Sequence, residues 1–228
     1  MTPHKKICFH TLGCKLNFSE TSYLSKLLDE EAYLKVAFLD KPDIYVFNTC
    51  AVTKNAVKEC HYLIRKALKH NSEAIIAVVG CYAQLKAQEI SNIEGVDLVL
   101  GTTEKFDLPK YIHEIESKKL LEKVHVGEIN DTKIFTPTFS LGERTRSFLK
   151  IQDGCDYFCS FCTIPLARGR SRSQTVDETI RVAKELAQTN VKEVVLTGVN
   201  IGDFGRVLSD SNKGFRQGEE NFYAYNSW

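Results

Sequence analysis

The stretch Ala74-Ile75-Ile76-Ala77-Val78-Val79-Gly80 is a continuous apolar run that ends in a glycine. A run of this kind is typical of a strand buried on both faces of a parallel sheet. The surrounding sequence alternates between segments with the apolar pattern of a strand and segments with that of a helix. Strands are predicted over residues 6–12, 44–48 and 97–100. Helices are predicted over residues 19–31, 53–69 and 108–119, the first of them capped by Ser19. Alternating strands and helices predict a doubly wound α/β domain over residues 1–126.

The pattern changes after this domain. Residues 127–146 contain Pro137, Gly142 and several threonines without a clear period, which indicates a linker. Residues 147–152 then read as a strand, residues 176–188 as a helix capped by Ser173 or Thr175, and residues 193–197 as another strand. This β/α/β unit predicts the start of a barrel-like domain over residues 147–205. Residues 206–228 lack periodicity and form a divergent tail.

Composition limits the class of protein. The chain has 228 residues, 43% of them hydrophobic, and a formal net charge of +1. This balance is that of an ordinary globular protein and does not by itself favour nucleic-acid binding. No apolar run is long enough to span a membrane and the first residues do not resemble a signal peptide, so we expect a cytoplasmic location and no membrane partner. Eight cysteines in such a setting indicate metal binding or catalysis rather than disulfides.

Three cysteines lie close together at Cys155, Cys159 and Cys162, with the spacing C-x-x-x-C-x-x-C. Three thiolates from one loop can hold three irons of a 4Fe-4S cluster and leave the fourth iron free for a small molecule. Structural zinc is a weaker alternative because it needs four ligands, and no His or Cys follows Cys162. Core packing is weaker still, since Asp156 and Ser160 interrupt any apolar period.

A second set of cysteines shares one topological position. Cys14, Cys50 and Cys81 each follow a predicted strand and precede a predicted helix. Because the carboxyl ends of parallel strands face one crevice, we expect these three to converge on a second cluster. Any one of them alone is as readily explained as a small buried residue at a turn. Cys8 and Cys60 do not share this position and are predicted to be core residues.

The quoted cysteines lie in segments that resemble a known family. The segments are TLGCKLN (11–17), NTCAVT (48–53), GCYAQ (80–84) and IQDGCDYFCSFCTIPLARGRSRS (151–173). Together they resemble the radical S-adenosylmethionine (SAM) methylthiotransferases from residue 6 to about residue 205. The likeness is greatest to the branch that converts N6-threonylcarbamoyladenosine beside the tRNA anticodon, at position 37, to its 2-methylthio derivative.

The resemblance implies a role for each cysteine set. Cys155, Cys159 and Cys162 would be the catalytic set, holding a 4Fe-4S cluster that binds SAM and cleaves it to a radical. The other three, Cys14, Cys50 and Cys81, would hold an auxiliary 4Fe-4S cluster that presents sulfur. The implied partners are tRNA, an electron donor and a sulfur source.

The resemblance also implies contacts to SAM. Phe161 is expected near the adenine of SAM, and Gly198 and Asn200, after the second barrel strand, are further candidates. Two arginines, Arg168 and Arg170, are candidates to meet phosphate or the SAM carboxylate, whereas Arg172 is expected in a solvated loop.

Family members continue into more barrel strands and an RNA-binding domain, which this sequence does not contain. We therefore expect the chain alone to be inactive on tRNA. Two alternatives stay open: a non-catalytic iron–sulfur-binding fragment, and a methylthiotransferase that acts on isopentenyladenosine in tRNA. A radical SAM enzyme with an unrelated substrate is disfavoured, because that broader superfamily does not require the three N-terminal cysteines.

Overall fold

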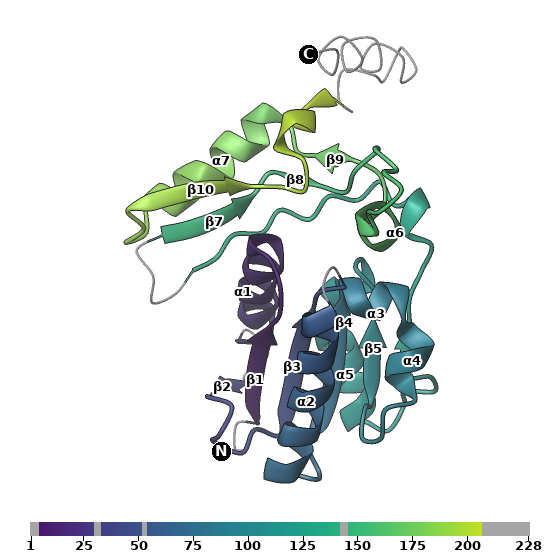
Figure 1. The fold of residues 1–228 in the computed structure, drawn as a ribbon. Helices are drawn as coiled ribbons and strands as arrows, with labels where there is room; N and C mark the ends of the chain where they lie inside the picture. The colour runs from purple at the N-terminus through teal and green to yellow at the C-terminus, as the bar shows by residue number, and fades with distance from the viewer. Residues whose placement is uncertain (1–4, 30–32, 52–53, 142–145, 207–228) are drawn as a thin grey trace.

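The computed structural model describes residues 5–29, 33–51, 54–141 and 146–206. A larger α/β part carries a six-stranded sheet, and a smaller part carries two two-stranded sheets. The smaller part lies over the end of the larger part at which its parallel strands point (Figure 1). Most of the predicted tail, residues 207–228, lies outside the described residues.

The six-stranded sheet has the strand order β2-β1-β3-β4-β5-β6, and all of its neighbouring strands are parallel. This confirms the doubly wound α/β prediction. The edge strands β2 and β6 were not predicted, because segments of two residues carry no period. The strands are β1 (Lys6–Thr11), β2 (Leu34–Lys35), β3 (Ile44–Thr49), β4 (Ile75–Gly80), β5 (Leu98–Leu100) and β6 (Val124–His125).

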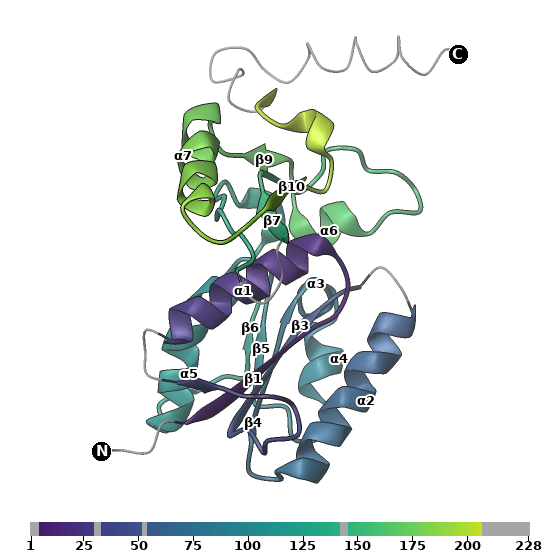
Figure 2. The ribbon, with the colours of Figure 1, turned by 90° about the vertical axis from the view of Figure 1, so that its left-hand side faces the viewer.

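Helices cover both faces of this sheet, as Figure 2 shows. One face packs against α1 (Lys15–Asp29) and α5 (Leu108–Glu116), which follows a single 3-10 turn, η1 (Glu104–Asp107). The other face packs against α2 (Lys54–His70), α3 (Cys81–Leu85) and α4 (Ala87–Ser91). Side chains of β3 alternate between the two cores, with Tyr45 and Phe47 in one and Ile44 and Val46 in the other. Among the described residues, no helix has both the length and the apolar character needed to cross a membrane.

The smaller part contains the predicted β/α/β unit. Strand β7 (Arg146–Lys150), helix α7 (Val176–Ala187) and strand β10 (Glu193–Thr197) follow in that order, and the two strands pair in parallel. The predicted strand over residues 147–152 is divided, because the chain leaves β7 and forms β8 (Gln152–Asp153), which pairs antiparallel with β9 (Arg172–Ser173). Of the two predicted caps of α7, the structure selects Thr175, since its side chain accepts a hydrogen bond from the Glu178 amide. The remaining elements are α6 (Ile164–Arg168) and the 3-10 turns η2 (Ile129–Asp131) and η3 (Ile201–Asp203).

Helix α1 begins four residues earlier than predicted, and the assignment of Ser19 as its cap was wrong. The Phe18 amide donates to the carbonyl of Cys14 at 3.1 Å, so the helix begins directly after that cysteine. The Ser19 hydroxyl lies inside the helix, 2.9 Å from the Leu16 carbonyl oxygen and 3.0 Å from the Thr138 hydroxyl. A buried hydrogen bond to a distant segment therefore occupies the side chain that would otherwise cap. Residues 30, 31 and 53, at the predicted helix limits, lie outside the described residues.

Gly80 ends β4 in a conformation that requires glycine. Its φ is 96°, and a Cβ placed there would lie 2.5 Å from the Asn48 Oδ1 atom and 2.9 Å from the Thr49 carbonyl oxygen. We predict that Gly80→Ala lowers the free energy of unfolding by about 1–3 kcal/mol or more, because backbone strain and steric overlap add. Urea unfolding monitored by circular dichroism measures this loss.

Gly205→Ala is the matched control for this change. Gly205 also has a positive φ of 81°, but nothing lies within 4 Å of an added Cβ. This control should lower the free energy of unfolding by about 1 kcal/mol, from backbone strain alone. Equal losses in the two variants would contradict a steric role for Asn48 and Thr49.

Candidate functional site

The first cysteine set lies at the carboxyl ends of three strands of the large sheet. Cys14 follows β1, Cys50 follows β3 and Cys81 follows β4, and these three strands are direct neighbours in the sheet. The strand order reverses direction between β1 and β3, which is where ligands bind in open α/β sheets. Gly13 contacts Cys50 so closely that a Cβ on Gly13 would overlap it. The structure thus brings the Cys14 and Cys50 turns together, as the sequence predicted.

Burial differs within this set. Cys50 and Cys81 are buried, whereas Cys14 is exposed. Burial raises the pKa of the Cys81 thiol, Arg168 and Lys105 oppose the rise, and the neighbouring Cys14 adds to it. The pKa of Cys81 therefore depends both on Cys14 and on two cations that lie outside the cysteine turns.

The second cysteine set lies in the loop between β8 and α6. The Cys155 amide donates to the Gly169 carbonyl at 3.0 Å, and the Cys162 amide donates to the Cys159 carbonyl at 3.0 Å. Gly154 precedes this loop with a φ of 72°, and a Cβ there would overlap the Arg170 carbonyl. The backbone consequently holds the start of the loop tightly while Cys159 stays exposed.

The donor atoms of both sets fit an iron–sulfur centre, but neither set has the geometry of a completed site. All eight cysteines are free. Among residues 5–29, 33–51, 54–141 and 146–206, no three His, Cys, Asp or Glu side chains are close enough together to hold a metal ion. Protonated thiols do not attract one another, and binding a metal requires them to lose their protons. In the described part of the chain, the Cys14 and Cys50 turns adjoin and the other set shares one loop, but neither set has the distances of metal coordination.

The candidate SAM contacts have different surroundings. The Asn200 amide donates to the Gln152 Oε1 atom at 2.8 Å, and a Cβ on Gly198 would lie 2.9 Å from that same oxygen. The Gln152 amide group in turn donates to the Gly154 carbonyl at 2.8 Å. Gly198 and Asn200 are therefore connected to the loop of Cys155 through one buried glutamine. Phe161 is 89% exposed, so its ring faces solvent.

The structure corrects the interpretation of two arginines. Arg172 was expected in a solvated loop, but it is buried and donates to the Arg168 carbonyl at 2.6 Å and to Asp153 at 3.3 Å. Arg168 is 1% exposed, and its side chain is fully engaged inside the protein, so it cannot meet phosphate from solvent. Arg170 is exposed, and its guanidinium lies 4.7 Å from the centre of the Phe158 ring.

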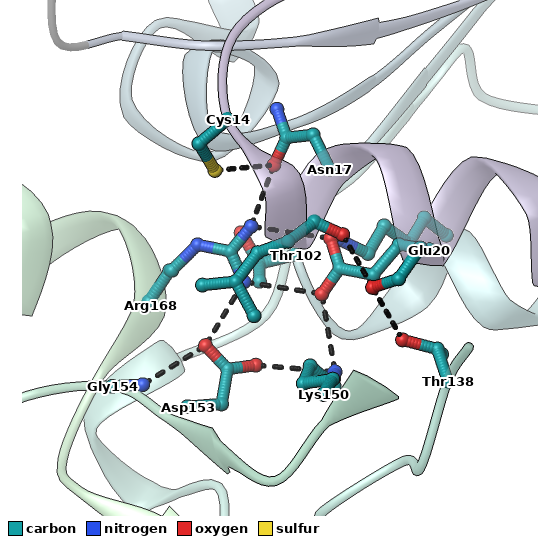
Figure 3. A network of polar contacts seen from close by, with 12 residues as sticks. Cys14, Asn17, Glu20, Thr102, Thr138, Lys150, Asp153, Gly154 and Arg168 are labelled. Atoms are coloured by element: carbon teal, nitrogen blue, oxygen red, sulfur yellow. Dashed lines mark hydrogen bonds and ion pairs between the residues drawn. The ribbon is translucent and has the colours of Figure 1, made fainter. Parts of the chain in front are cut away.

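These arginines belong to a buried charge network that joins the two parts of the chain (Figure 3). Glu20 of α1 is its centre and accepts hydrogen bonds from Lys105, from Lys150 at 3.1 Å and from Arg168 at 3.1 Å. Asp153 of β8 accepts from Arg168 at 2.9 Å. No role was predicted for Glu20, Lys105, Lys150 and Asp153, because no local sequence pattern marks a charge as buried. The network consists of Glu20, Lys105, Lys150, Asp153, Arg168 and Arg172.

The buried charge network carries an excess of two positive charges, since four cations face two carboxylates. Burial alone would raise the pKa of Glu20, but Arg168, Lys105 and Lys150 hold it well below its usual value. Burial lowers the pKa of Lys105, and Glu20 opposes that shift. A buried excess of positive charge is stabilised by nearby anions. Arg168 and Lys105 act on the Cys81 thiol in this sense, because they oppose the rise in its pKa that burial causes.

Glu20→Gln should destabilise the chain strongly, because it leaves three buried cations without their shared partner. We predict a loss of about 3–5 kcal/mol in the free energy of unfolding, measured by urea unfolding. The matched control is Glu185→Gln, which removes a carboxylate from an exposed pair with Arg181. That change should stay within about 0.5 kcal/mol. Similar losses in both variants would contradict the central place of Glu20.

Comparison with known sequences agrees with this division of the chain. The sequence model described as "Uncharacterized protein family UPF0004" matches residues 6–101, which include the first cysteine set. The model described as "Radical SAM superfamily" matches residues 149–208, which include the second. The chain thus combines an N-terminal α/β domain with the start of a radical SAM domain.

The curated relatives that this chain matches are methylthiotransferases. The chain is 40% identical over 213 residues to the threonylcarbamoyladenosine tRNA methylthiotransferase MtaB of Bacillus subtilis, covering 90% of this chain and 46% of that protein. It is also 40% identical over 203 residues to the protein of that name from Aquifex aeolicus, covering 88% and 49%. A tRNA-2-methylthio-N(6)-dimethylallyladenosine synthase of Clostridium botulinum is 33% identical over 204 residues, covering 87% and 45%. The chain is therefore similar to radical SAM methylthiotransferases over about nine tenths of its own length, and it spans about half the length of the curated relatives that it matches.

Proposed function

We propose that this chain carries the two iron–sulfur sites of a tRNA methylthiotransferase that acts on N6-threonylcarbamoyladenosine at position 37. The observation that supports this most is the placement of two three-cysteine sets on either side of one buried charge network. The proposed ligands are Cys14, Cys50 and Cys81 for one 4Fe-4S cluster and Cys155, Cys159 and Cys162 for the other.

The chain's own residues have definable parts in this function. When bound, a 4Fe-4S cluster with an open iron and SAM supplies one-electron chemistry. Gly13 leaves room for the Cys14 turn to approach Cys50, since any side chain there would overlap it. Gly154 allows the loop of Cys155 to pass against the Arg170 carbonyl. Both cysteine sets thus depend on a glycine that permits close backbone approach.

Arg168 and Lys105 oppose the burial-driven rise in the pKa of Cys81, so they favour the thiolate that iron binding requires. Gln152 orients the segment of Gly198 and Asn200 against the loop of Cys155. Exposure of Cys159 and Phe161 leaves the second set open to a small molecule such as SAM. The electron donor and the sulfur source belong to the proposal as partners and are not specified by the described residues.

Iron content tests the two sites. We predict about eight irons per chain after anaerobic reconstitution, because two 4Fe-4S clusters contain that number. Replacing Cys155, Cys159 and Cys162 with alanine should remove about half of the iron, and replacing Cys14, Cys50 and Cys81 should remove the other half. The control replaces Cys8 and Cys60, both buried in the core of the sheet, and should lose no iron.

SAM cleavage in the same variants separates an enzyme from a non-catalytic iron–sulfur fragment. Reduced chain lacking Cys14, Cys50 and Cys81 should still cleave SAM, whereas chain lacking the other set should not. Full iron retention in either triple variant, or cleavage without Cys155, Cys159 and Cys162, would contradict the assignment.

The isopentenyladenosine alternative is the second candidate for the substrate. The 33% identity to a dimethylallyladenosine synthase keeps it open, while the 40% identity to the threonylcarbamoyladenosine enzymes favours the first candidate. Deleting the encoding gene and analysing tRNA nucleosides by mass spectrometry distinguishes them. We predict loss of the 2-methylthio group from threonylcarbamoyladenosine and an unchanged isopentenyl derivative; the opposite pattern would select the alternative. That this chain by itself does not modify tRNA stays a prediction.

A further inference from the structure

Arg168 lies between the two cysteine sets and contacts the segments that carry both. Its Nη2 atom donates to the Asn17 Oδ1 atom at 2.6 Å, and its Nη1 atom donates to Asp153 at 2.9 Å. Both nitrogens also donate to Glu20 at 3.1 Å. Figure 3 shows the guanidinium among these three side chains. One planar group therefore joins α1 of the larger part to β8 of the smaller part.

On the side of the first cysteine set, the Asn17 side chain contacts Arg168 and also hydrogen-bonds to two of the cysteine turns. Its Nδ2 atom donates to the Leu12 carbonyl at 2.9 Å and to the Thr49 carbonyl at 3.0 Å. Leu12 lies two residues before Cys14, and Thr49 directly precedes Cys50. Asn17 is fully buried, so these bonds are shielded from water. Arg168 consequently fixes the amide group that holds the turns of Cys14 and Cys50 together.

On the side of the second set, Asp153 plays the corresponding part. The oxygen that accepts from Arg168, Oδ1, also accepts from the Gly154 amide at 2.9 Å. Gly154 directly precedes Cys155. The other carboxylate oxygen, Oδ2, accepts from Lys150 and Arg172, so the carboxylate is fixed from both sides.

Two other contacts between the two parts involve different groups. The Thr102 hydroxyl donates to the Ala167 carbonyl at 2.7 Å, and the Phe18 and Phe148 rings pack edge to face at 5.8 Å between centroids. These contacts hold α6 and β7 in place. Arg168 differs because its fork reaches the residues that immediately support both cysteine sets, and a lysine has no second donor arm in the same plane.

We propose that Arg168 is a positioning residue that fixes the placement of the Cys14 and Cys50 turns relative to the Cys155 loop. This inference rests on the proposed function for its purpose, because two clusters that act on one substrate need a defined separation. The link between the two cysteine-bearing segments exists in the chain without metal as well. Asn17 and Asp153 are the two contacts through which the link acts.

Amide hydrogen exchange in the metal-free full chain tests the link directly. The probes are the amides of Leu12, Gly154 and Cys155, each of which donates a hydrogen bond in this structure. We expect Arg168→Met to speed exchange about tenfold or more at all three, because charge-assisted hydrogen bonds on both sides are lost. Amides of the central strand β3 should keep their exchange rates, which shows that the sheet remains folded. The control is Arg181→Met, a change on the exposed face of α7.

Arg168→Lys separates positioning from charge compensation and serves if the methionine variant does not fold. Lysine keeps the charge but cannot contact Asn17 and Asp153 with two parallel donors. We expect faster exchange at Leu12 and at Gly154 and Cys155 in this variant too. Rates equal to those of the unaltered chain would overturn the proposal in favour of charge alone. Faster exchange on one side only would also overturn it.

The metal-loaded chain supplies a second measurement. With both clusters reduced, electron paramagnetic resonance reports the magnetic interaction between them, which depends on their separation. In Arg168→Lys we expect unchanged iron content and an altered interaction; an unaltered interaction with full iron would overturn the proposal. If the unaltered chain bound no iron, the proposed function would fail while the exchange measurement still decided the link.

Discussion

The ion pairs of Glu20 with Lys105, Lys150 and Arg168 are the interaction on which the arrangement of this chain depends. One fully buried carboxylate accepts from the α/β part and from the smaller part at once. Isolated charges of this kind cannot be buried without partners, so the two parts must dock for the charges to be satisfied. The docking in turn holds Arg168, which follows the second cysteine loop, against Asn17 and Glu20 of α1, which follows Cys14. Fold and candidate site are thus set by the same contacts.

Burying such a charge network carries a desolvation penalty, so its main effect is to specify one placement of the two parts rather than to add stability. Apolar residues of similar size would pack in its place without the desolvation penalty, and they would tolerate several relative placements. Hydrogen bonds between the planar guanidinium of Arg168 and two carboxylates allow few relative placements of the two parts. Two of its cations, Arg168 and Lys105, also oppose the rise in the pKa of Cys81 that burial causes, which apolar residues would not do. The composition of the interface therefore matches the chemistry proposed beside it.

The sequence predicted the elements whose signal is local. The strand Glu193–Thr197 was predicted with its observed ends, and one of the two predicted caps of α7, Thr175, is the observed one, because each depends on neighbouring residues alone. The convergence of the turns of Cys14 and Cys50 followed from the rule for parallel strand ends. Ser19 and Arg172 were misread because their partners, Thr138 and Asp153, lie 119 and 19 residues away in the sequence. Burial of a charge is decided by such distant partners, and a single sequence does not reveal them.

The distance along the chain between Glu20 and Arg168 has a consequence for how the protein is made. These residues are 148 positions apart, so the arginine is synthesised long after α1 has left the ribosome. At ~5–20 residues per second the delay is roughly 7–30 seconds. During that interval Glu20 and Lys105 can meet, but the turns of Cys14 and Cys50 lack the guanidinium that holds them through Asn17. Nascent chains therefore present an incompletely supported thiol pair before the second cysteine loop exists.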